Sequence, residues 1–139
     1  MSLEREDYLM RQIMQMGQVL ARMLARLINI KQVPDAGLSL DEIKQIYSTE
    51  LDLSLDLVQK TSAEDLIKLL KTDFNFIEQH LEQMADILSE TANIFENTEK
   101  EQARELRQKS IIILEHLQES TGIYSFDRIS KITQLRNLL

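Results

Sequence analysis

Glycine and proline account for only four of the 139 residues, and this scarcity limits the folds open to the chain. Sandwiches and barrels of short strands need many tight turns, and tight turns need the positive φ of glycine or the fixed φ of proline. Four such residues are too few for a fold of that kind. We therefore expect an all-α protein built from a few long helices.

The length and residue usage narrow the architecture further. A chain of 139 residues favours one domain, 1–139, which is large enough to bury a substantial core. The absence of cysteine excludes thiol catalysis, disulfides and cysteine-based zinc sites. No apolar run approaches the roughly 20 residues that span a bilayer, and the start does not resemble a signal peptide. These features predict a cytoplasmic protein.

The net charge of −7 is concentrated in the middle of the sequence. Residues 32–99 contain fifteen acidic residues and four lysines, whereas residues 1–31 and 100–139 each carry a balance of +2. An acidic middle repels phosphate, so the charge argues against nucleic acid as a partner. The acidic side chains are expected to solvate the outer faces of helices, although an enzyme that uses carboxylates of 32–99 is an alternative.

The strongest pattern lies in the first 31 residues, where apolar side chains recur at alternating steps of four and three. This spacing is typical of a long helix with a packing seam, and it predicts a helix over about residues 3–31. The seam consists of Leu9, Ile13, Met16, Leu20, Met23, Leu27 and Ile30. Four more apolar residues, Met10, Met14, Leu24 and Ile28, widen the surface beyond one seam. We therefore expect this helix to have more than one packing partner.

Gly17 lies inside this predicted helix, where glycine costs roughly 1 kcal/mol relative to alanine. A close approach by another helix, for example from a second copy of the chain, or a hinge would explain its presence. The predicted self-association surface consists of Ile13, Met16, Gly17, Leu20, Met23 and Leu27. Binding to a membrane surface is disfavoured, because three acidic residues offset the bases and no Trp or Phe is present in the segment.

The remaining sequence, 39–139, predicts shorter helices joined by short connections, which lie antiparallel as hairpins. Residues 33–37 contain the only proline and predict a loop. Capping signals predict helices that begin near Ser39, Ser62, Asp73, Thr98 and Ser125, with a break in the first of these near Ser54. Gly122 is the expected residue after a helix end. The fold prediction is therefore five or six helices.

Motifs that carry chemistry are absent from the sequence. Helical metal sites often use Glu-x-x-His pairs, but the residues three before His80 and His116 are isoleucines. There is also no His-Glu-x-x-His, no glycine-rich phosphate loop and no Gly-x-Ser-x-Gly elbow. We therefore predict no catalytic residue, no metal and no cofactor.

The sequence also resembles an uncharacterised family of small bacterial helical proteins, a domain of unknown function. The resemblance is carried by residues 7–13 (DYLMRQI) with 20–24 (LARML), by 38–43 (LSLDEI), and by the ending from 124–128 (YSFDR) to 138–139. It implies tetratricopeptide-like helical hairpins, although the Trp-Leu-Gly-Tyr pattern of a true repeat of that type is absent. It implies no activity and no catalytic residue.

These observations predict a non-catalytic module for protein–protein interaction, acting as a homodimer or with another protein. Two alternatives remain open at this point. The apolar helix faces predict a binding site for a small hydrophobic ligand if they enclose a pocket. The acidic residues of 32–99 predict an enzyme if at least two of them converge in a cleft.

Overall fold

The computed structural model describes the backbone of residues 2–31 and 36–139 and the side chains of 3–30 and 40–139. Within these residues the fold is all-helical, with seven helices and no strand. The helices are α1 (Ser2–Lys31), α2 (Ala36–Leu51), α3 (Leu55–Lys60), α4 (Ala63–Asp73), α5 (Glu78–Phe95), α6 (Lys100–Thr121) and α7 (Phe126–Leu138). The all-α class and the long N-terminal helix are confirmed, and the helix count is higher than the five or six expected.

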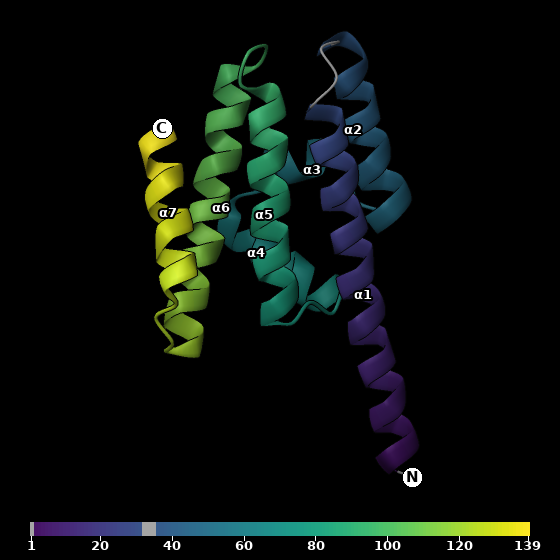
Figure 1. The fold of residues 1–139 in the computed structure, drawn as a ribbon. Helices are drawn as coiled ribbons and strands as arrows, with labels where there is room; N and C mark the ends of the chain where they lie inside the picture. The colour runs from purple at the N-terminus through teal and green to yellow at the C-terminus, as the bar shows by residue number, and fades with distance from the viewer. Residues whose placement is uncertain (1, 32–35) are drawn as a thin grey trace.

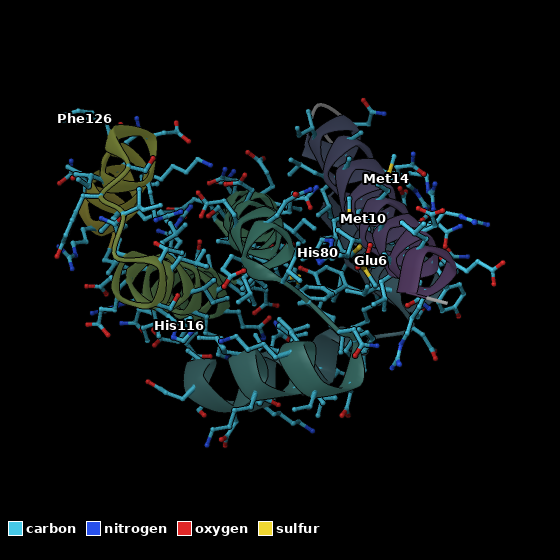
Figure 2. The ribbon with its side chains drawn as sticks, turned by 90° about the horizontal axis from the view of Figure 1, so that it is seen from below. Glu6, Met10, Met14, His80, His116 and Phe126 are labelled. Atoms are coloured by element: carbon cyan, nitrogen blue, oxygen red, sulfur yellow. The ribbon has the colours of Figure 1, made fainter. Side chains whose placement is uncertain are left out.

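The long helices lie side by side in the order α7, α6, α5, α1, α2, with α3 and α4 behind them (Figure 1). Neighbours in the sequence form antiparallel pairs at α5–α6 and α6–α7, whereas α1 runs parallel to α5. Figure 2 looks up along these helices and shows α4 lying across them. Because α1 packs on α5 rather than only on its neighbour in sequence, a tetratricopeptide-like stack of hairpins is not confirmed.

Two of the predicted caps, Ser62 and Ser125, are confirmed at atomic level, and Ser54 caps the helix that follows the expected break. The hydroxyls of Ser54, Ser62 and Ser125 accept hydrogen bonds from the backbone N–H three residues later, at the starts of α3, α4 and α7. Ser54 marks the expected break, because α2 ends at Leu51 and α3 begins after it. Gly122 follows α6 in the left-handed conformation with φ 66°, a geometry that glycine adopts without strain.

Two predicted helix starts are wrong. Helix α2 begins at Ala36 rather than at Ser39, so Gly37 of the predicted loop lies inside a helix, while residues 33–35 of that loop lie outside the described residues. Helix α5 begins at Glu78 rather than at Asp73. The reason is a helix ending. Asn75 has the left-handed φ of 57°, and the Phe76 N–H donates to the Leu70 carbonyl at 3.0 Å, so the chain turns back onto the last turn of α4 before α5 begins.

A continuous hydrophobic core joins α1, α2, α5 and α6, and Tyr47 and Thr91 form a hydrogen bond inside it. The Tyr47 hydroxyl donates to Thr91 Oγ1 at 2.8 Å, because the Thr91 hydroxyl is itself bonded to the Ile87 carbonyl. Burial raises the pKa of Tyr47 well above its usual value, so the phenol stays neutral. These bonds fix α2 against α5 and thereby fix the C-terminal half of α1 between them.

An ion-pair cluster also fastens α1 to α2. Glu50 accepts hydrogen bonds from Arg22 Nε at 2.7 Å and Arg26 Nη1 at 3.0 Å, and the bond from Arg22 is the main reason why the pKa of Glu50 lies below its usual value. A lowered folded-state pKa stabilises the fold above the unfolded pKa, and this contribution disappears as pH falls through the folded value.

Replacing Glu50 with Gln should therefore lower the free energy of unfolding by about 0.5–1 kcal/mol at pH 7, since both arginines are half exposed and screened. The difference from the wild type should shrink toward zero between about pH 5 and pH 3. Urea denaturation of the wild type and the variant at pH 7 and at about pH 3 measures this difference in the free energy of unfolding. Glu42→Gln on the exposed face of α2 is the control, and an equal effect from it would contradict the assignment to the arginine pairs.

Candidate functional site

The two halves of α1 have different surroundings. Residues 20–30 pack against α2 and α5, and every third or fourth side chain there is buried. The first turns extend past the ends of the neighbouring helices, so that the N-terminus stands clear of the rest of the molecule (Figure 1). We call residues 3–16 the projecting half of α1. No residue in it is fully buried, although it contains several large apolar side chains.

The six residues predicted to form a self-association surface are divided between these halves. Leu20, Met23 and Leu27 are fully buried in the core of the single chain, so they offer no surface to a partner while this fold is intact. Ile13, Met16 and Gly17 are half-buried at the junction with the projecting half. The structure therefore brings the six together along one side of α1 but leaves only the N-terminal three accessible.

The junction between the halves is held by polar side chains of α5. His80 is fully buried, and its Nε2 lies 2.9 Å from the Ile13 carbonyl oxygen. Its Nδ1 accepts from the Ile77 N–H at 3.1 Å, so the ring carries its proton on Nε2 and donates to Ile13. Gln83 Nε2 donates to the Gly17 carbonyl at 3.0 Å. Figure 2 shows His80 pointing from α5 toward α1.

Gly17 faces α5 at this junction. A Cβ added there would lie 3.4 Å from Gln79 Nε2 and 3.8 Å from Gln83 Oε1, which are ordinary van der Waals distances to flexible side chains. The neighbours of Gly17 are therefore glutamine side chains of the same chain. These flexible side chains leave room for a Cβ, so the packing does not require glycine at position 17.

A groove of about 600 Å³ follows the projecting half where α5 begins. Its walls come from α1 and from the segment that connects α4 to α5. The lining is mixed apolar and polar: Leu9, Gln12, Ile13, Gln15, Met16, Val19, Phe74, Asn75, Ile77 and His80. The groove is the best candidate for the hydrophobic-ligand alternative, although His80, its buried polar group, already has both ring nitrogens engaged.

A second apolar row runs along α1 on a different face. Its large members are exposed: Leu3 is 73% exposed, Met10 57%, Met14 60% and Ile28 38%. These residues belong to a second series of alternating steps of four and three, which also includes Asp7, Gly17, Ala21 and Leu24. We call this series the second seam. In Figure 2 Met10 and Met14 lie on α1 with Glu6, at the end of the helix nearest the viewer.

Two acidic residues of 32–99, Asp86 and Glu90, line one hollow of about 270 Å³ together with Lys131, and several others pair with cations elsewhere. Glu82 contacts Arg128 at 3.1 Å, Asp86 contacts Lys131 at 3.1 Å, and Glu96 pairs with Arg107. Each carboxylate thus faces a cation from α6 or α7. Within the described residues there is no group of three or more His, Cys, Asp or Glu placed to hold a metal ion. The enzyme alternative therefore stays a prediction.

The second histidine lies in a charged hollow of about 550 Å³ between α4 and α6. His116 Nε2 accepts from the Lys71 ammonium at 3.0 Å (Figure 2 labels His116). The hollow mixes both signs of charge: Glu64, Lys68, Lys71, Glu115, His116 and Glu119. Carboxylates and cations here neutralise one another, so the hollow has no clear preference for an anion or a cation.

No protein-family model, no curated protein and no solved structure matches the chain. The resemblance to a family of small helical proteins therefore stays a prediction. Among the described residues, no helix has the length and hydrophobicity needed to cross a bilayer.

Proposed function

We propose that the chain is a non-catalytic protein-interaction module whose contact surface is the projecting half of α1. The observation that carries the proposal is the exposure of large apolar side chains on a helix that stands clear of the body. These side chains are Leu3, Tyr8, Leu9, Met10 and Met14. Apolar side chains gathered on one exposed element mark an interaction site, whereas scattered ones do not.

The shape of the helix supports the same proposal. An isolated helix of about a dozen residues is marginal in water, because nucleation is costly and few hydrogen bonds offset it. The projecting half avoids the nucleation cost by continuing the packed helix, but its side with Leu3, Met10 and Met14 stays exposed. A partner that covers that side would remove apolar surface from water and suppress fraying. Methionine suits such a contact because its flexible side chain adapts to the facing surface.

A photo-crosslinking experiment tests the proposal in the cells that make the protein. A benzophenone side chain is placed at Leu3, and at Leu57 on α3 as a control that is also exposed and apolar. We expect discrete covalent adducts from position 3 and not from position 57. Equal labelling from both positions, or none from position 3, would overturn the proposed function.

The double variant Met10→Gln, Met14→Gln should reduce the adducts from position 3 at least about fivefold, because it removes apolar contact area and keeps good helix formers. The free energy of unfolding should change by less than about 0.5 kcal/mol, since both side chains are exposed. Leu57→Gln, Ile123→Gln is the matched control, with the same chemistry at exposed positions elsewhere. A loss of adducts in the control would contradict the assignment.

The groove beside the projecting half gives the hydrophobic-ligand alternative a definite location. Its volume of about 600 Å³ falls in the range of small-molecule sites. Native mass spectrometry of the purified protein separates the two functions: a retained small molecule that is lost in Ile13→Glu supports the ligand, and the mass of the bare chain argues against it.

A further inference from the structure

We propose that the partner of the projecting half is a second copy of the same chain, bound antiparallel along the second seam. The inference rests on the proposed function and names the partner for it. It starts from the positions in the projecting half that share the seam: Leu3, Asp7, Met10 and Met14. Three are exposed apolar residues, and Asp7 is the single charge in the row.

Asp7 determines the orientation of the pair. In a parallel pair in register, each seam residue meets its own copy, so two Asp7 carboxylates would face each other in the contact. Like charges held together there repel. In an antiparallel pair, Leu3 instead packs against Met14 of the second copy, and Asp7 lies against Met10 of the second copy. The two carboxylates are then separated, and the apolar residues still meet.

Charged residues beside the seam favour the same register. In it, Glu4 of each copy lies opposite Arg11 of the other, since position 4 falls between seam residues 3 and 7 and position 11 between 10 and 14. Arg11 of the second copy is also adjacent to Asp7. The two-fold symmetry forms each of these opposite-charge pairs twice. The projecting half is therefore complementary in charge to its own reversed copy.

These three charged side chains are available for such contacts. Glu4, Asp7 and Arg11 are exposed, and none of them forms an ion pair among the described residues. Asp7 and Arg11 are four residues apart on one helix and still make no contact. Elsewhere on α1, Arg22 and Arg26 are both engaged by Glu50. Among the described side chains of α1, the charges without an ion pair therefore lie in the projecting half, where the second copy would bind.

The geometry of the molecule permits this pairing. Because the projecting half extends beyond the other helices, the antiparallel arrangement places the two bodies at opposite ends of the contact (Figure 1). An overlap of residues 3–14 is about 18 Å long at 1.5 Å per residue. A contact of this size is small, so we expect a dissociation constant on the order of 10–100 μM.

A charge exchange followed by sedimentation equilibrium of the full-length protein tests the pairing. Glu4→Arg and Arg11→Glu should each weaken dimerisation by about 5- to 30-fold, because each places two like-charge pairs in the dimer. The double variant Glu4→Arg, Arg11→Glu restores opposite charges between positions 4 and 11, but the new carboxylate at position 11 lies beside Asp7 of the other copy. It should therefore dimerise at least about threefold more tightly than either single variant and more weakly than the wild type. Thermal unfolding of the monomer shows whether each variant is folded.

Cross-linking tests the orientation independently, and the absence of native cysteine makes it simple. A short bismaleimide should join a Glu4→Cys copy to an Arg11→Cys copy in a mixture. It should not join two Glu4→Cys copies, which an antiparallel pair keeps apart.

The outcomes separate this inference from the proposed function. A monomer up to 1 mM that still gives adducts from position 3 with a different protein overturns the second copy and leaves the interaction module standing. A dimer that joins two Glu4→Cys copies, or that the double charge exchange does not tighten relative to either single variant, overturns the antiparallel register. If the double variant Met10→Gln, Met14→Gln dimerises as tightly as the wild type, the dimer uses another surface and pairing along the second seam is overturned. The adducts from position 3 then decide the proposed function separately.

Discussion

Truncating Leu20 to Ala should lower the free energy of unfolding by about 2–5 kcal/mol and leave the native mass in solution unchanged. Leu20 is fully buried in the core that joins α1 to α2 and α5, so the truncation removes buried methyl groups and leaves a cavity. For a chain of this length, such a loss lowers the melting temperature by about 5–20 °C. Urea denaturation and sedimentation equilibrium together measure both parts of the prediction.

Leu9→Ala is the matched control, because Leu9 belongs to the same heptad series but is 48% exposed in the projecting half. Its effect on the free energy of unfolding should stay below about 0.5 kcal/mol. A change of oligomeric mass in Leu20→Ala with little loss of stability would show that Leu20 faces a partner rather than the core.

The pair Leu20 and Leu9 illustrates what the sequence reveals about α1. The four-and-three spacing predicts a helix and its seam. The helix is confirmed over Ser2–Lys31, and the seam is buried only from Leu20 to Ile30. The spacing is the same at Leu9 and Leu20, so it carries no information on which part of the seam is covered. That depends on where α5 begins along α1, and the alignment of His80 with Ile13 is a tertiary contact between residues 67 positions apart.

The helix boundaries follow a similar division between local and non-local information. Serine caps at residues 54, 62 and 125 and the glycine at 122 were predictable, because each bonds or bends within its own turn. Asp73 was misread as a start because an aspartate before an apolar run is a strong cap signal. The competing signal was Asn75, since asparagine accepts the left-handed conformation that ends a helix.

The second seam could be found in the sequence only in part. Met10, Met14, Leu24 and Ile28 indicated a wider apolar surface, but a buried face and an exposed face have the same composition. The structure separates them, because α5 and α2 occupy the first seam from Leu20 onward and leave Met10 and Met14 exposed. Residue spacing thus locates an apolar face, and the packing of distant segments decides whether it is core or surface.

His80 joins α5 to α1, although it belongs to none of the catalytic or metal-binding motifs considered for this sequence. The ring is fully buried, contacts the Phe76 ring edge to face with centroids 5.5 Å apart, and bonds two backbone groups. In one bond, His80 Nδ1 accepts from the N–H of Ile77 at the start of α5, where the Ile77 side chain has no oxygen that could cap the helix. The other reaches the Ile13 carbonyl and sets the position of α1 along α5. The buried imidazole thus bonds the Ile77 N–H and the Ile13 carbonyl, and an apolar side chain of equal size could bond neither group.

Replacing His80 with Ala should therefore lower the free energy of unfolding by about 2–4 kcal/mol, since it leaves the Ile77 N–H without its acceptor and opens a cavity beside Phe76. Amide hydrogen exchange should also become faster in the first half of α1, because the junction that holds that half against α5 is lost. His116→Ala is the control: that ring is partly exposed and has one partner, Lys71, so the loss should stay below about 1 kcal/mol. Equal losses in the two variants would show that the bonds of His80 to Ile77 and Ile13 contribute nothing specific. A loss confined to His80→Ala, with faster exchange in the first half of α1, would show that the bonds of His80 help to hold that half against α5.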